Sequence, residues 1–119
     1  MAHQNPARRD IDRSGDDLLL RLVGGDPAAS AEVQGLASTS DNPALLVAAA
    51  ILSLDFSHLR RAAALARSTR DRQLVVLAEA HLHRHADLFD VLVREHLADY
   101  PDQLLAAWLA AGRPLTHPT

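Results

Sequence analysis

Two helical patterns that follow each other with almost no break are the feature that most limits the fold. They occupy residues 71–101 and separate near His85; the letters are DRQLVVLAEAHLHRHADLFDVLVREHLADYP. In the first half, Leu74, Leu77 and Ala78 recur at spacings of three and four, as on one face of an α-helix. Because so short a connection forces consecutive helices to lie antiparallel, the stretch predicts a helical hairpin.

The composition extends this expectation to the whole chain. Of the 119 residues, 48% are hydrophobic but only 3% are aromatic, so Leu, Val and Ala must build the core. Leu and Ala are strong helix formers, and a chain of this length forms one domain with a modest core. We therefore predict an all-α domain of six to seven antiparallel helices over residues 15–112. Residues 1–14 read as a disordered N-terminal tail, and residues 113–119 read as a C-terminal tail.

Capping residues and prolines predict where the other helices begin. Asp26 precedes Pro27, either Asp41 or Asn42 precedes Pro43, and Asp55 or Ser57 can cap the next helix. The helix that begins near Pro43 is apolar on nearly every face, so we expect it to be the most buried one. The later helices are expected over about 71–84, 87–99 and 101–112, the last stopping at Gly112.

An internal repeat is visible in three segments, 45–50, 74–79 and 104–109, which align at offsets of 29 and 30 residues. A period near 30 that is built from helix pairs is typical of a helical solenoid. Chains rich in Ala and Leu also produce such alignments by chance. We therefore predict stacked helical hairpins, with a compact helical bundle as the alternative.

Within residues 41–111 the chain resembles the tetratricopeptide-repeat family. The resemblance rests on Leu77-Ala78, Ala80-His81 and the closing Asp99-Tyr100-Pro101, although His85 stands where the family has Gly. It implies a non-catalytic scaffold whose concave surface binds a peptide or helix of a partner protein. The groove positions that the resemblance implies are Leu46, Ala50, Leu54, Arg72, Val75, Glu79, Leu82, His83, Leu105 and Leu109.

Charge supports a different function as the alternative. Residues 58–85 carry a net charge of +4 within a chain whose net charge is −3. Arginines in such a region can contact phosphates, so the alternative is nucleic-acid or anion binding. No aromatic residue is interleaved for base stacking, which makes nucleic acid the weaker expectation. The basic face comprises Arg60, Arg61, Arg67, Arg70, Arg72 and Arg84.

Histidines are the remaining candidates for chemistry. His81 and His85 share a helix face and could chelate a metal, with Glu79 and His83 nearby. The chain has no Cys and no HExxH motif, so we expect packed and solvated histidines, with no metal and no cofactor. No nucleophile elbow or phosphate loop is present either, and we expect no enzyme activity.

The remaining expectations concern location and self-association. No apolar run reaches about 18 residues and the start lacks a signal-like apolar segment, which favours the cytoplasm and no membrane partner. Arginine without lysine suggests a GC-rich bacterial source. The helix over 101–111 carries Leu104, Leu105, Trp108 and Leu109. This apolar stripe predicts a homodimer or partner contact, with a buried Trp in a closed monomer as the alternative.

Overall fold

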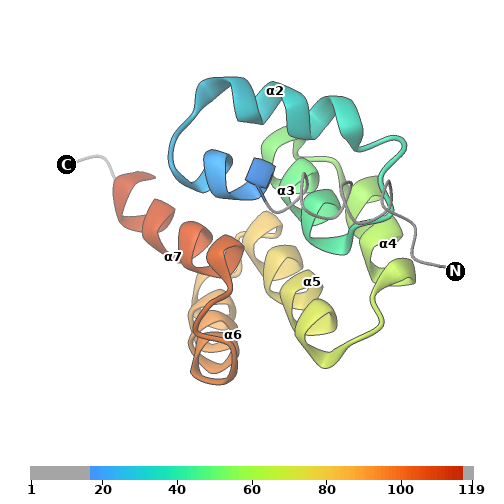
Figure 1. Cartoon of the computed structure of the whole chain (residues 1–119). Coiled ribbons are helices and arrows are strands. Elements are labelled where there is room, and N and C mark those ends of the chain that lie inside the picture. The colour runs from blue at the N-terminus through green and yellow to red at the C-terminus, as the bar shows by residue number, and fades with distance from the viewer. Residues whose placement is uncertain (1–16, 117–119) are drawn as a thin grey trace, which may run out of the picture.

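Seven helices and no strand make up the part of the chain that the computed structural model describes, residues 17–116, with residues 112–116 described by backbone only. The first helix is described over residues 17–23. The others are α2 (Pro27–Leu36), α3 (Pro43–Ser53), α4 (Phe56–Leu65), α5 (Thr69–Leu82), α6 (Ala86–Asp99) and α7 (Leu104–Thr116), as Figure 1 shows. The all-α prediction is confirmed. The N-terminal tail predicted over 1–14 lies outside the described residues.

Side-chain caps account for most helix starts. Asp26 accepts a hydrogen bond from the Ala28 N–H at 2.9 Å, and Asn42 accepts one from the Ala44 N–H at 3.0 Å. Asp55 caps α4 in the same way. Ser68 caps α5, since its hydroxyl accepts a hydrogen bond from the Asp71 N–H at 3.0 Å. The start of α6 is different, since His85 makes no side-chain cap hydrogen bond.

The helix α3 is the centre of the molecule. Its residues 45–50 are six consecutive buried positions, and it packs against α2, α4 and α5. A helix that is covered on nearly all sides needs an apolar sequence all round, and this one contains no charged residue. The prediction that it is the most buried helix is therefore confirmed.

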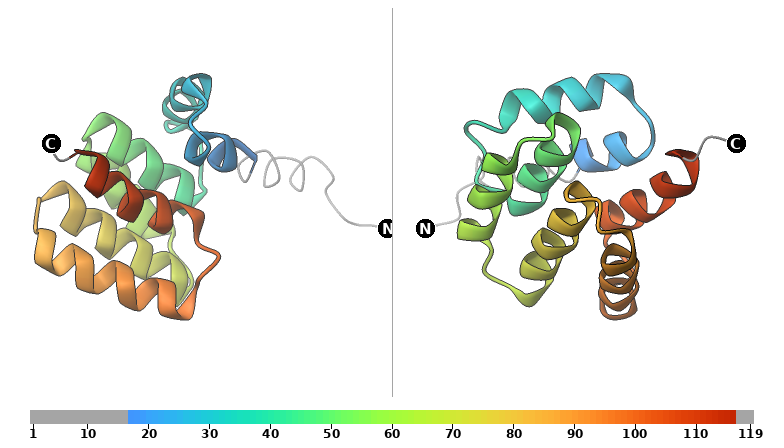
Figure 2. Two further views of the ribbon diagram at one scale, coloured as in Figure 1. Left: turned by 90° about the vertical axis from the view of Figure 1, so that its left-hand side faces the viewer. Right: turned by 180° about the vertical axis from the view of Figure 1, so that it is seen from behind.

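Two helical hairpins, α3–α4 and α5–α6, lie side by side, and α3 contacts both α4 and α5 (Figures 1 and 2). The turns that close them are alike. Leu54 and Arg84 both take left-handed backbone conformations, with φ of 57° and 61°. The N–H of the next residue then donates to the carbonyl of Ala50 in one turn, at 3.2 Å, and of Ala80 in the other, at 3.0 Å.

The two turns lie 30 residues apart, as measured from Leu54 to Arg84. Matched on these turns, Ala50 corresponds to Ala80, whereas the predicted alignment of 45–50 with 74–79 has an offset of 29. Apolar residues are so dense in both helices that a shift of one position still pairs Leu, Val and Ala with one another.

The C-terminal helix differs from expectation at both ends. It begins at Leu104 rather than near Pro101, and it continues beyond Gly112 to Thr116. Residues 101–102 form a turn instead. A glycine inside a helix costs only about 1 kcal/mol relative to Ala, so Gly112 need not end one.

Candidate functional site

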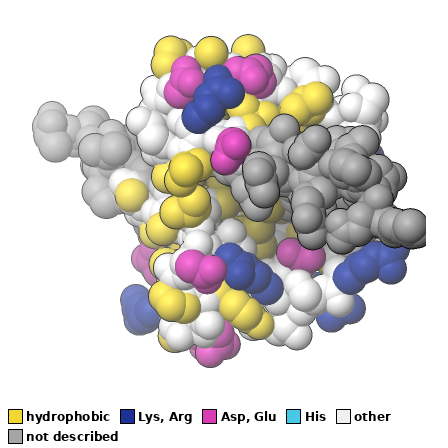
Figure 3. All heavy atoms as spheres, viewed as in Figure 1, with side chains coloured by type: hydrophobic (Ala, Val, Ile, Leu, Met, Phe, Trp, Pro, Cys, Tyr) yellow, Lys and Arg dark blue, Asp and Glu magenta, His cyan; other side chains and the backbone are white. Residues whose placement is uncertain are grey.

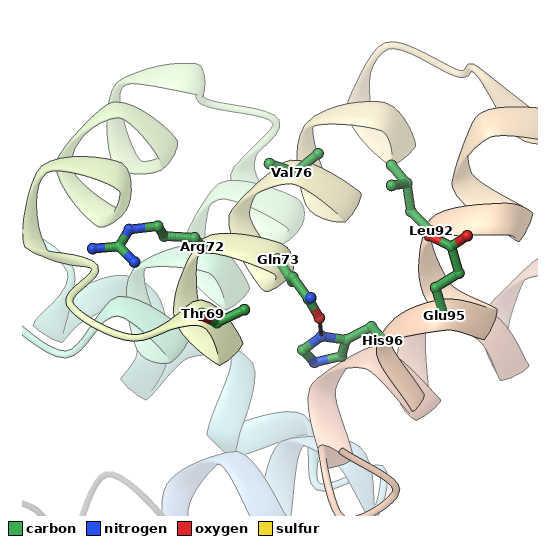
Figure 4. Close-up of a pocket in the computed structure, with 7 residues that line it drawn as sticks. All are labelled: Thr69, Arg72, Gln73, Val76, Leu92, Glu95 and His96. Carbon is green, nitrogen blue, oxygen red and sulfur yellow. Dashed lines mark hydrogen bonds between the residues drawn. The ribbon is translucent and has the colours of Figure 1, made fainter. Parts of the chain in front are cut away.

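A groove between α5 and α6 opens at the surface of the molecule (Figure 4). Its volume is about 290 Å³. The α5 wall is built from positions three and four residues apart, and the α6 wall from residues near its C-terminal half. The residues that line the groove are Thr69, Arg72, Gln73, Val76, Leu92, Glu95 and His96.

The upper part of the groove is apolar. Val76 of α5 and Leu92 of α6 lie on its opposite sides (Figure 4). Val76 is 46% exposed, and Leu88, one helical turn before Leu92, is 48% exposed. Single exposed apolar side chains are common on proteins. Apolar side chains on both sides of one hollow form a surface whose burial by a partner is favourable.

The floor of the groove is polar and is closed by a hydrogen bond between the helices. His96 Nδ1 lies 2.8 Å from Gln73 Oε1. Because an amide oxygen only accepts, the imidazole must donate from Nδ1, which leaves the Nε2 lone pair inside the protein. Nε2 is buried and has no hydrogen-bond partner among the described residues.

The electrostatic environment keeps this imidazole neutral. His96 is only 1% exposed, and burial is the main cause that lowers its pKa below the ordinary value of 6.5. The positive charge of Arg70 lowers the pKa further, while Asp99 acts in the opposite direction. A buried neutral imidazole that joins two helices through a hydrogen bond is a structural group here.

Two charges of opposite sign stand at the margins of the groove. Arg72 is exposed and extends away from Gln73, whereas Glu95 lies beside Leu92 (Figure 4). Neither side chain has an ion pair or hydrogen bond with another described residue. The groove thus combines apolar walls with one free cation and one free anion.

The ten groove residues implied by the family resemblance do not line one common groove in the structure. Five of its ten residues are buried in the core: Leu46, Ala50, Val75, Leu105 and Leu109. Leu82 is half-buried, and the exposed members are Leu54, Arg72, Glu79 and His83. Only Arg72 lines the α5–α6 groove.

The physical reason is which face of each helix its neighbours cover. Val76, and not Val75, lies on the exposed face of α5. On α3, the helix α2 and the neighbouring hairpin cover the surface that an open array would present. His96 was not identified as a site residue from the sequence. The signal that could have identified it is its spacing of three and seven residues from Val93 and Phe89, which share the buried face of α6.

The six arginines of the predicted basic face have different environments. Arg61 donates to the carbonyl oxygens of Ala37 and Ser40, the second at 2.8 Å, and so ties α4 to the segment that follows α2. Arg70 pairs with Asp102 at 3.4 Å and lies over the Tyr100 ring. The other four are exposed: Arg60, Arg67, Arg72 and Arg84. The structure therefore does not present all six as one free cationic surface.

The histidines at positions 81, 83 and 85 make ring contacts with aromatic residues and with one another. His83 lies between the rings of Phe56 and His85, with centroid distances of 4.8 and 5.7 Å. His81 instead contacts Phe89 at 5.3 Å. Among the residues that the structure describes, no group of three or more His, Cys, Asp or Glu side chains is placed to hold a metal ion.

The apolar stripe of α7 is divided between core and surface. Leu105 and Leu109 are 1% and 4% exposed, so they belong to the core of the monomer. Trp108 is half-buried against that core, and Leu104 is 42% exposed. A contact between two copies would therefore involve the Leu104 side of the helix.

Fold and groove together define an all-α protein of helical hairpins with a surface groove between two helices. No family model matches the chain, and no curated protein or solved structure gives a match. Across the described residues, no helix has the length and apolar character needed to cross a membrane.

Proposed function

We propose that this chain is a non-catalytic interaction module that holds a segment of a partner protein in the α5–α6 groove. The observation that carries the proposal is the pair Val76 and Leu92, which face each other across a hollow and are continued along α6 by the exposed Leu88. Covering apolar surface contributes about 25 cal/mol per Å² removed from water.

The shape of the groove favours an amphipathic helix as the bound segment. The groove is formed by two adjacent helices. A third helix fills such a hollow with side chains spaced by three, four and seven residues. Arg72 and Glu95 lie on different helices, so a partner with a complementary pair of charges would bind in one orientation.

Affinity measurements on selected peptides test this proposal. Peptides chosen from a random helical library for binding to the wild-type chain are measured against Val76→Asp and Val91→Asp. Both valines are 46% exposed, but only Val76 lines the groove. We expect Val76→Asp to weaken binding at least about tenfold, as for a central interface position, and Val91→Asp to leave it unchanged.

Salt separates this proposal from anion binding through the exposed arginines. Binding in the apolar groove should hold its affinity when salt rises, whereas phosphate contacts lose affinity linearly on a log–log scale. Equal weakening by both valine variants, or a steep loss with salt, would contradict the groove proposal.

A further inference from the structure

A second hollow lies between the turns of the two hairpins, α3–α4 and α5–α6. Its volume is about 520 Å³, and it shares no lining residue with the α5–α6 groove. The hollow is open to solvent, since Leu54 in its lining is 72% exposed. The lining residues that matter here are Leu54, Leu82, Arg84, His85, Ala86 and Phe89.

The two turn residues with left-handed backbone conformations both belong to this lining. Leu54 and Arg84 have φ of 57° and 61°, in a region that glycine occupies at the lowest cost and that other residues rarely adopt. Residues held in such sparsely populated conformations cluster at sites that hold a ligand. Here the two turns contribute one apolar and one cationic side chain to the same hollow.

Arg84 is the charged member of the lining. It is exposed, and it makes no ion pair or side-chain hydrogen bond with another described residue. Beside it, His85 is also exposed and makes no side-chain cap hydrogen bond to α6. A guanidinium and an imidazole at one hollow provide hydrogen-bond donors for an anion from outside.

No acidic residue lines this hollow. Asp55, the residue after Leu54, is engaged at the start of α4, where it accepts a hydrogen bond from the Ser57 N–H at 2.9 Å. Asp87, in the first turn of α6, is not part of the lining. On the face drawn in Figure 3, by contrast, arginine and acidic side chains are interspersed among the hydrophobic ones. A charged lining of one sign favours a ligand group of the opposite sign.

We propose that this hollow binds a segment of a partner protein in which an acidic side chain neighbours a large apolar one. The planar guanidinium of Arg84 can hold a carboxylate through two parallel hydrogen bonds. Leu54, Leu82 and Phe89 supply apolar surface for the neighbouring side chain. A protein segment suits this hollow better than a free small molecule, because small-molecule sites usually enclose most of their ligand.

The test is an NMR titration of the ¹³C,¹⁵N-labelled full chain with the peptide acetyl-Gly-Leu-Glu-Ala-Gly-amide. We expect saturable shifts of the Leu54 methyl signals and of the Arg84 backbone N–H signal. Replacing Glu in the peptide by Gln removes the charge at nearly constant shape and should weaken binding about tenfold. Equal affinity for the two peptides would overturn the proposal, and so would unmoved Leu54 and Arg84 signals at about 10 mM peptide.

Arg84→Gly is the matched test on the protein side. Because glycine favours the left-handed conformation, the variant should keep or raise Tm while its affinity for the Glu peptide falls about tenfold. Arg67→Gly is the control, since Arg67 is exposed, lies between α4 and α5 and does not line the hollow. It makes the same change in net charge and should leave the affinity unchanged.

Two results with these variants would contradict the proposal. One is an equal affinity change in Arg84→Gly and Arg67→Gly, including no change in either, because the hollow would then have no special role. The other is a clear fall in the Tm of Arg84→Gly, because Arg84 would then be a structural residue.

This inference goes beyond the α5–α6 groove and stands or falls separately from it. Val76→Asp alters the groove but not this hollow, so it should leave the affinity for the Glu peptide unchanged. Loss of that affinity in Val76→Asp would overturn the second site. Silent Leu54 and Arg84 signals in the wild type would overturn it too, without affecting the proposed function of the groove.

Discussion

Gln73 on α5 accepts a 2.8 Å hydrogen bond from His96 on α6, and this bond joins the two helices beneath the proposed binding groove. It also sets the tautomer of His96, since Nδ1 must carry the proton. The stability of the groove is therefore linked to the protonation of one buried imidazole.

The pH dependence of stability follows from that link. The pKa of His96 in the folded chain lies below its ordinary value of 6.5, because burial and Arg70 disfavour the charged form more than Asp99 favours it. The unfolded chain binds the proton more readily, so folding stability rises with pH through this window and is lost as pH falls below about 6.5.

Urea unfolding of the wild type and His96→Phe at pH 7.5 and 5.5 measures the effect. We expect the wild type to lose more stability on acidification than His96→Phe does, because the variant lacks this proton-binding site. The other histidines are common to both proteins and act as the internal control. An equal loss in the two proteins would contradict the assignment.

Ala78 provides a test of the packing between the hairpins. It is fully buried in α5, so Ala78→Leu should overpack the contact and destabilise the fold by about 1–3 kcal/mol. Ala63→Leu on the exposed face of α4 is the control and should change stability by less than about 0.5 kcal/mol. Thermal or urea unfolding compares the two, and an unaffected Ala78→Leu would show that the position tolerates volume.

Arg61 distinguishes a structural arginine from an exposed one. Its guanidinium donates to two backbone carbonyls, of Ala37 and Ser40, so Arg61→Ala should cost about 1.5–3 kcal/mol. Arg60→Ala, the exposed neighbour, should be nearly neutral. Urea unfolding gives both values. If the two variants lose the same stability, the contacts of Arg61 are not what holds the segment after α2.

Leu104 and Leu105 together test the homodimer through α7 that the sequence predicts. Leu105 is 1% exposed, so Leu105→Glu should unfold the chain by burying an unpaired carboxylate. Leu104 is 42% exposed, so Leu104→Glu should fold, and it should turn a dimeric wild type into a monomer. Analytical sedimentation measures this, and a monomeric wild type would exclude the homodimer at the concentrations used.

Much of the fold followed from local chemistry that the sequence displays directly. Asp26, Asn42 and Asp55 cap helices where expected, since capping depends on residues only two or three positions apart. The all-apolar helix α3 was also recognisable, because an apolar sequence on every face requires burial on every face.

The site was less accessible to sequence reasoning because it depends on which neighbour covers which face. The resemblance implied Val75 as a groove residue, yet Val75 is buried and its neighbour Val76 is 46% exposed. The hydrogen bond between His96 and Gln73 joins residues 23 positions apart. Neither residue belongs to a sequence motif from which this contact could be predicted.

Methyl NMR of a Leu- and Val-labelled chain, bound to a library-selected helical peptide, tests the central claim most directly. We predict that the methyl signals of Val76, Leu88 and Leu92 shift on binding, while those of the equally exposed Val91 and of Leu20 stay in place. Shifts confined to Leu20, Val91 or other positions away from α5 and α6, with Val76 and Leu92 unmoved, would contradict the groove as the site of binding.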